Sequence, residues 1–179
     1  MGDFAMRAKH WQVFLLTLPV LVLMNLNIVG AELIGSLISA VAYCLYFIWF
    51  AFLGTALFPL LPRGAYYNLS WFIVDIILSA LAFSALVILT DDRSFHGEGP
   101  MALVMLYAFF ALLHGPWFLA VSLVSIEKQH DPEFGFYFGT LLCFLFWPVG
   151  VWFIQPRLNK VWKESRSREQ QLGRAGIDG

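Results

Sequence analysis

Charged residues are scarce in this chain of 179 residues, at 13% of the sequence, and cysteine occurs only twice, at Cys44 and Cys143. So little charge excludes an ordinary water-soluble domain and a nucleic-acid-binding surface. The two cysteines fall in separate apolar segments and form no Cys-x-x-Cys pair, so neither a redox pair nor a zinc site is indicated. We expect both to be small packing residues.

Motifs of the common enzyme classes are also missing. No glycine-rich phosphate loop follows a strand, no His-Glu-x-x-His occurs, and no Ser/His/Asp set lies in a soluble segment. A bis-histidine haem needs two ligands at matching depth, but the histidines other than His114 lie at span ends or in connections. The sequence therefore predicts no catalytic residue, no cofactor and no enzyme activity, with a lipid-modifying intramembrane enzyme as the weakest alternative.

One connection is rich in metal-ligand residue types. It holds Glu127, His130, Asp131 and Glu133. This set could bind a metal, although a solvated polar loop is several times more common for such a segment. We therefore predict no metal site.

Long apolar runs dominate the sequence, which is 60% hydrophobic with a mean hydropathy of +0.73. Five runs reach the roughly 20 residues that a membrane-spanning helix needs. They cover residues 11–29, 33–61, 71–90, 101–126 and 134–154. These runs are too long and too uniformly apolar for barrel strands. We predict an all-α, multi-pass bundle over residues 1–156, in contact with the lipid bilayer, followed by a basic tail over residues 157–179.

Basic residues indicate the orientation. The tail holds six of the eleven, and an odd number of spans places the termini on opposite sides. The positive-inside rule then favours a cytoplasmic tail, although weakly. We expect the last helix to continue past Pro156 as a short basic helix on the anionic membrane surface.

Asp75 is the one carboxylate inside an expected span. An acid at membrane depth costs about 2.5 to 3.5 kcal/mol on insertion scales and usually needs a partner. Because short loops make consecutive helices antiparallel neighbours, Asp75 falls level with residue 116, within one turn of His114. The sequence therefore predicts that Asp75 and His114 face each other as a titratable pair.

The same reasoning extends this pair to a polar layer. Thr55 falls level with Asp75, Trp147 falls level with His114, and helical spacing adds Ser79 and Tyr107. Two prolines, Pro116 and Pro148, should break their helices near this depth, because each lacks the N–H of a helical hydrogen bond. We predict a pathway layer of six residues: Asp75, His114, Thr55, Ser79, Tyr107 and Trp147.

Two simpler interpretations of the pair remain open. Asp75 lies near a span end, so water or the basic residues of the same side, Arg63, Arg7 or Lys9, could neutralise it. His114 could be a neutral histidine hydrogen-bonded to another helix.

Small residues four positions apart mark where helices can approach closely. We expect close helix contacts at two such pairs, Gly35 with Ser39 and Gly135 with Gly139. Eighteen phenylalanines leave much apolar surface for lipid or another subunit to cover. We therefore expect a homo-oligomer or other membrane subunits as partners.

Two functions follow from these observations. The first is conduction or transport of a proton or small solute through the polar layer. The alternative is a non-catalytic accessory or assembly subunit of a larger membrane complex. A water-accessible cavity that reaches His114 would favour the first function over the second.

Overall fold

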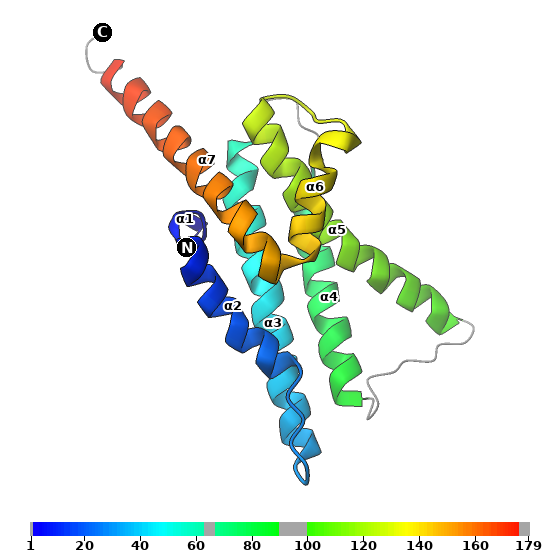
Figure 1. Cartoon of the computed structure of the whole chain (residues 1–179). Coiled ribbons are helices and arrows are strands. Elements are labelled where there is room, and N and C mark those ends of the chain that lie inside the picture. Colours follow the sequence, from blue (N-terminus) through cyan, green and yellow to red (C-terminus); the bar gives the residue numbers. More distant parts are fainter. Residues whose placement is uncertain (1, 63–66, 90–99, 176–179) are drawn as a thin grey trace.

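The computed structural model describes residues 2–62, 67–89 and 100–175, and all regular structure within these ranges is helical. The elements are α1 (Gly2–Arg7), α2 (His10–Met24), α3 (Glu32–Leu57), the 3-10 turn η1 (Phe58–Leu60), α4 (Leu69–Leu89), α5 (Pro100–Lys128), α6 (Phe134–Leu145) and α7 (Trp147–Ala175) (Figure 1). The predicted all-α class is confirmed.

Within the described ranges, three helices are long and apolar enough to cross a membrane: Glu32–Leu60, Leu69–Leu89 and Met105–Lys128. The apolar runs 11–29 and 134–154 were predicted as spans, but they form shorter helices. With 15 and 12 residues, α2 and α6 extend only about 22 and 18 Å, below the roughly 30 Å of a hydrocarbon core. Within the described chain, three candidate spans are therefore shown, and the other two predicted spans are not.

The three long helices form the body of the molecule. Figure 1 shows α3 rising from the lower end of the molecule with α4 beside it, and α5 crossing from the lower right toward the upper part. At Gly54 of α3, an added Cβ would lie 2.2 Å from the ring of Phe72 on α4. Glycine at this position lets the two helices approach closely, and this approach fixes where α4 presents its polar side chains.

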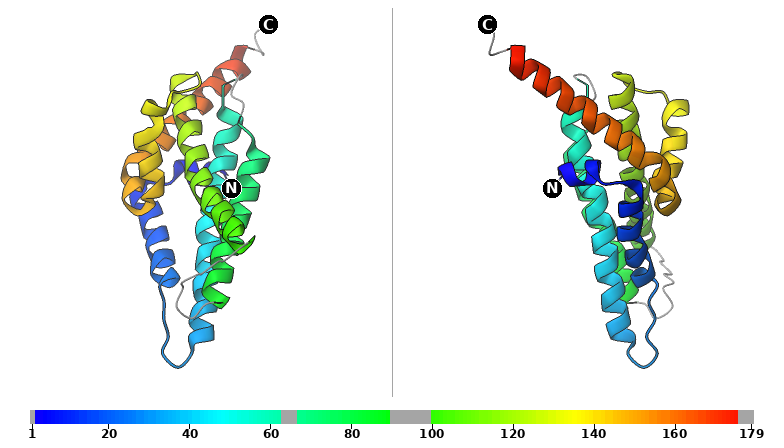
Figure 2. Two further views of the ribbon diagram at one scale, coloured as in Figure 1. Left: turned by 90° about the vertical axis from the view of Figure 1, so that its right-hand side faces the viewer. Right: turned by 60° about the vertical axis from the view of Figure 1, so that its left-hand side comes forward.

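The last two helices form a hairpin that turns back inside the bundle. Figures 1 and 2 show α6 descending from the end of α5 and α7 rising again toward the same end of the molecule. The helix stops at Phe146 (φ −98°, ψ 49°), and Pro148 stands in the first turn of α7, where its missing N–H has no helical partner to lose. This reversal explains why residues 134–154 do not form one span.

Gly150 makes the turn possible. An added Cβ there would lie 1.7 Å from the carbonyl oxygen of Cys143, so only glycine allows the first turn of α7 to fold against α6. The break expected at Pro148 is thus found just before that residue. The break expected at Pro116 is not found, because α5 continues through it. As expected, α7 continues past Pro156.

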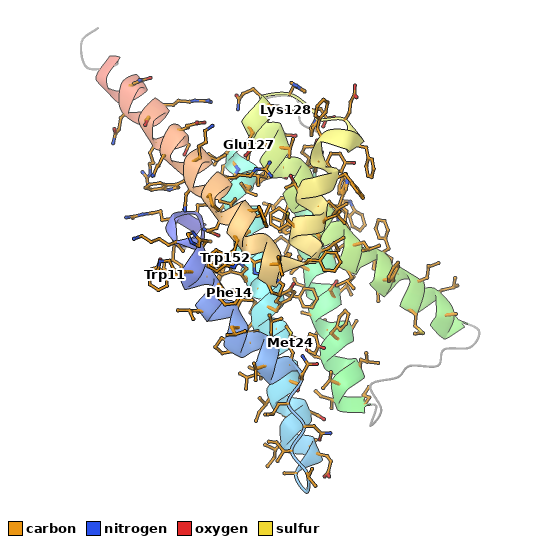
Figure 3. All side chains as sticks on the ribbon, in the orientation of Figure 1. Trp11, Phe14, Met24, Glu127, Lys128 and Trp152 are labelled. Atoms are coloured by element: carbon orange, nitrogen blue, oxygen red, sulfur yellow. The ribbon has the colours of Figure 1, made fainter. Side chains whose placement is uncertain are left out.

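A polar clasp fixes the hairpin to α5. Arg157 of α7 donates from Nε to Glu127 Oε1 at 2.8 Å and from a terminal nitrogen to Glu127 Oε2 at 2.5 Å. Its other terminal nitrogen donates to Thr140 of α6 at 2.8 Å. Such a two-pronged contact suits the planar guanidinium and gives more geometric specificity than a point charge would. Figure 3 labels Glu127 at the end of α5.

A second polar contact fixes α1. The amide nitrogen of the fully buried Gln155 on α7 donates to the carbonyls of Ala5 and Ala8 at 2.8 and 3.0 Å. These carbonyls belong to the end of α1, where helical partners run out. Nearby, Trp152 packs on His10 and Phe14 of α2 (Figure 3). Together these contacts join the N-terminal helices to the start of α7.

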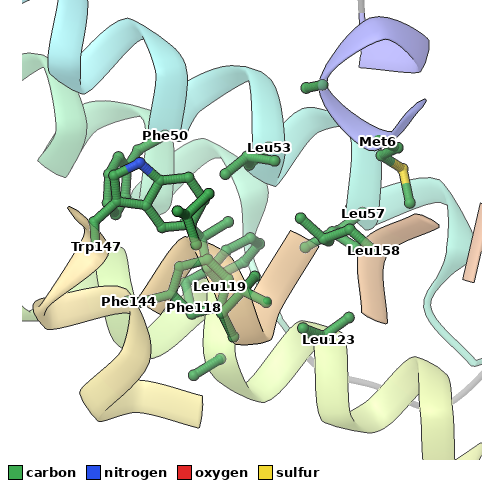
Figure 4. Packing of buried hydrophobic residues seen from close by; sticks show 14 of the residues in the cluster. Met6, Phe50, Leu53, Leu57, Phe118, Leu119, Leu123, Phe144, Trp147 and Leu158 are labelled. Atoms are coloured by element: carbon green, nitrogen blue, oxygen red, sulfur yellow. The ribbon is translucent and has the colours of Figure 1, made fainter. Parts of the chain in front are cut away.

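Aromatic side chains fill the centre between α3, α5 and the hairpin. Trp147 is fully buried, stacks on Phe144 at 5.7 Å between ring centroids and meets Phe50 edge-on at 5.6 Å (Figure 4). Leu53, Leu119 and other aliphatic side chains continue this cluster. The centre of the bundle is therefore packed by side chains, and the pocket described next lies to one side of it.

Candidate functional site

Asp75 and His114 form a buried pair between α4 and α5. The distance from His114 Nδ1 to Asp75 Oδ2 is 2.6 Å, and the two side chains are 17% and 3% exposed, respectively. Asp75 stands six residues into α4, which places it about 9 Å from the start of that helix. The predicted pairing of these two residues is confirmed, and Asp75 is buried rather than solvated at the span end.

Tyr107 occupies the second carboxylate oxygen. Its hydroxyl donates to Asp75 Oδ1 at 2.8 Å. Tyr107 and His114 are seven positions apart on α5, which is two helical turns, so both reach α4 from the same face. One face of α5 thus supplies partners to both oxygens of Asp75.

The His114 ring is held between two aromatic rings of its own helix. Phe110 lies at 5.8 Å between ring centroids with an interplanar angle of 11°, and Trp117 lies at 5.3 Å with an angle of 25°. Spacings of four and three residues along α5 produce this stack. Aromatic faces attract a positive charge, so the stack can accommodate an imidazolium as well as an imidazole.

The pair lines a pocket of about 330 Å³. Six of its lining residues are aromatic, and the others are Asn68, Asp75 and His114. The aromatic residues are Tyr67, Trp71, Tyr107, Phe110, Trp117 and Phe118. A pocket of this size, lined mostly by aromatic side chains, is large enough to hold a small molecule.

A second polar cluster lies where α4 begins. The hydroxyl of Tyr67 donates to a carboxylate oxygen of Asp131 and lies 3.3 Å from Ser125 Oγ. Burial, followed by the hydrogen bond to Asp131, raises the pKa of Tyr67 to about 12. Tyr67 therefore stays protonated at neutral pH and acts as a fixed donor at one end of the pocket.

The remaining residues of the predicted layer lie away from the pocket lining. Ser79 is buried one turn beyond Asp75. Thr55 is exposed, and its hydroxyl donates to the carbonyls of Ala51 and Phe52 of its own helix, both at 3.0 Å. Trp147 belongs to the central aromatic cluster. The structure thus brings Asp75, His114 and Tyr107 together.

The predicted packing positions divide into two groups. Ser39 donates to the carbonyl of Leu23 at 3.0 Å, and an added Cβ at Gly35 would lie 3.3 Å from the backbone nitrogen of Ile28. Both therefore lie where α3 meets α2 and the connection after it. By contrast, an added Cβ at Gly135 or Gly139 would meet nothing within 4 Å, so this pair is open on the surface of α6.

The acidic residues at the end of α5 and in the connection after it make contacts within the protein. Glu127 binds Arg157, and Asp131 binds Tyr67. Among the residues that the structure describes, no group of three or more His, Cys, Asp or Glu side chains could hold a metal ion.

Several important residues were missed by the sequence analysis. The spacing of Phe110 and Trp117 around His114 could have indicated the first two. The position of Gly150, two residues after Pro148 inside an apolar run, could have indicated the third. Gly54 carried no signal, because its role depends on the ring of Phe72 on another helix.

Comparison with protein family models, with curated proteins and with solved structures finds no match for this chain. The functional argument therefore depends on the geometry of the site.

Proposed function

We propose that this protein conducts or transports a proton or a small solute across a membrane, and that Asp75 and His114 carry it. The observation that supports this proposal most strongly is the 2.6 Å contact between the two side chains on the wall of a pocket. Buried ionisable side chains at membrane depth are expensive, so they usually mark an ion or proton pathway.

The chemistry of the pair fits this role. A carboxylate and an imidazole in contact are both groups that can bind a proton and pass it on. Tyr107 occupies the other carboxylate oxygen, and the flanking rings tolerate both states of the imidazole. A pair with a purely structural role does not need to line a pocket. A pair that binds and releases a proton must be reachable from outside the bundle.

The proposal includes the setting of the pair. Residues 1–156 would form the membrane domain, and residues 157–179 a basic segment on the cytoplasmic side. Lys160 and Lys163 are exposed on α7 beyond the apolar part of the helix, which agrees with a contact to anionic lipid.

Proton flux into liposomes containing the purified protein tests the proposal. Asp75→Asn and His114→Ala should each abolish the flux while the protein remains folded, because each removes one proton-binding partner. Glu32→Gln and His10→Ala change an acid and a histidine outside the pocket and should retain wild-type flux. Equal flux from Asp75→Asn and the wild type would contradict the proposal.

The alternative function, an accessory subunit of a larger membrane complex, is favoured by one observation. Gly135 and Gly139 form a small-residue face that no described part of the chain covers. If this face docks a second copy or another subunit, Gly139→Leu should disrupt the assembly in native mass spectrometry. Thr55→Leu, a matched substitution on the exposed face of α3, should leave the assembly intact. A protein that is monomeric and active with either substitution would contradict this alternative.

A further inference from the structure

We propose that the pocket beside Asp75 binds a monovalent organic cation with a compact apolar body, in competition with a proton on His114. This inference depends on the proposed function of the Asp75–His114 site and names the class of solute that the site accepts.

The lining of the pocket supports the cation. Six aromatic residues line the space, among them Trp71 and Trp117. Indole and phenol faces attract cations, most strongly where water is excluded. The volume of about 330 Å³ suits a small organic molecule and exceeds what a bare metal ion needs.

The charge of the pocket lining also favours a cation as the ligand. Asp75 is its one carboxylate, and no lysine or arginine belongs to the lining within the described residues. A buried carboxylate with apolar walls would repel an anion strongly and would provide the counter-charge for a cation.

Protonation of the pair changes the balance of charge. When His114 carries a single proton, its ring is neutral and the pair has a net charge of −1. When the ring binds a second proton, the imidazolium neutralises Asp75 and the pocket loses its net charge. The cation and this second proton should therefore exclude each other.

The groups next to the pair do not add a further change of charge in this pH range. On α5, Tyr107 also reaches Asp75, but a neutral tyrosine does not alter the net charge. On α3, which also packs against α4, no titratable side chain makes a hydrogen bond or ion pair with Asp75 in the described part of the chain. At the end of the pocket, Tyr67 stays protonated at neutral pH.

Calorimetric titration of the purified full chain tests the inference. The probe is benzyltrimethylammonium, and the control ligand is neopentylbenzene, which has the same shape without the charge. At about pH 8 the cation should bind at least roughly tenfold more tightly than the neutral analogue. Between about pH 8 and about pH 5 the cation should lose affinity by up to tenfold per pH unit, as one displaced proton requires, whereas the neutral analogue should not.

Substitutions test whether the pair causes the affinity for the cation and its pH dependence. Asp75→Asn should lower the affinity for the cation by at least roughly tenfold and abolish its pH dependence, whereas Glu32→Gln, an exposed acid on α3, should change neither. If Asp75→Asn fails to fold, the comparison of the two ligands across pH in the wild type still tests the inference. Equal affinity for the charged and neutral ligands, or cation binding that does not change with pH, would overturn the inference.

The same measurements separate this inference from the proposed function. Proton flux that depends on Asp75, without binding of the cation, would overturn the inference and leave the proposed function standing. Binding of the cation in competition with protons, without any flux in liposomes, would support the inference and contradict transport.

Discussion

His114 Nδ1 on α5 lies 2.6 Å from Asp75 Oδ2 on α4, and the same α5 face supplies the Tyr107 hydroxyl to the other oxygen of the carboxylate. Among the residues that the structure describes, both side-chain partners of Asp75 therefore come from one neighbouring helix. Any movement of α5 relative to α4 would change the partners of Asp75. The pair thus links the geometry of two candidate spans to the charge inside the pocket.

The first prediction concerns the coupling of the pair. Removing one partner leaves the other buried and unpaired, so Asp75→Ala and His114→Ala should each lower the free energy of unfolding by about 3 kcal/mol. The double variant should be destabilised by clearly less than the sum of the two single changes. Reversible unfolding in mixed detergent measures all three variants. Strictly additive effects would show that the two side chains do not interact.

The second prediction concerns the turn between α6 and α7. Gly150→Ala places a methyl group against the carbonyl of Cys143 and should lower the melting temperature sharply or prevent folding. Gly135→Ala is the matched control, because its methyl group meets nothing within 4 Å. Within a helix, alanine is more stable than glycine by about 0.5 to 1 kcal/mol, so the control should be neutral or slightly stabilising. Similar melting temperatures for the two variants would contradict the tight turn.

The third prediction concerns topology. Because α6 and α7 form a hairpin that returns to the end where it began, positions 133 and 167 should face the same side of the membrane. Position 29, in the connection between α2 and α3, should face the other side. Single cysteines at Val29, Glu133 and Ser167, in a chain with Cys44 and Cys143 changed to alanine, can be labelled with a membrane-impermeant reagent.

The labelling outcome decides between two topologies. Labelling of positions 133 and 167 from the same side, and of position 29 from the other, would support the hairpin. Labelling of positions 133 and 167 from opposite sides would show that residues 134–154 cross the membrane as a single span, as the apolar run alone suggested.

The sequence predicted the Asp75–His114 pair because that inference required only two assumptions, which concern helix order and the cost of a buried acid. A short connection forces α4 and α5 to be antiparallel neighbours, so depth can be counted along the chain, and an acid at membrane depth needs a partner. The same count put Thr55 level with Asp75 but carried no information on helix rotation. Thr55 faces outward, and its hydroxyl is satisfied by its own helix.

The predicted fifth span does not form one continuous helix, for a different physical reason. Hydropathy measures how apolar a run is, and residues 134–154 are equally apolar whether they cross a membrane or turn back inside the bundle. The turn depends on the conformation of Phe146, on Pro148 in the first turn of α7, and on the absence of a side chain at Gly150. Trp147 was placed in the polar layer by a straight-helix count, and the turn moved it into the central aromatic cluster.

Nitrogen NMR of the His114 ring in lipid bilayers tests the central claim most directly, because it reports the protonation of the imidazole itself. Spectra of the wild type across pH, with His114→Gln used to assign the signals, should show a protonation change at His114. In Asp75→Asn the nitrogen signals of His114 should differ from those of the wild type, because the imidazole has lost its charged partner. Identical His114 signals in the wild type and Asp75→Asn, or a His114 ring that never changes its protonation, would contradict the account.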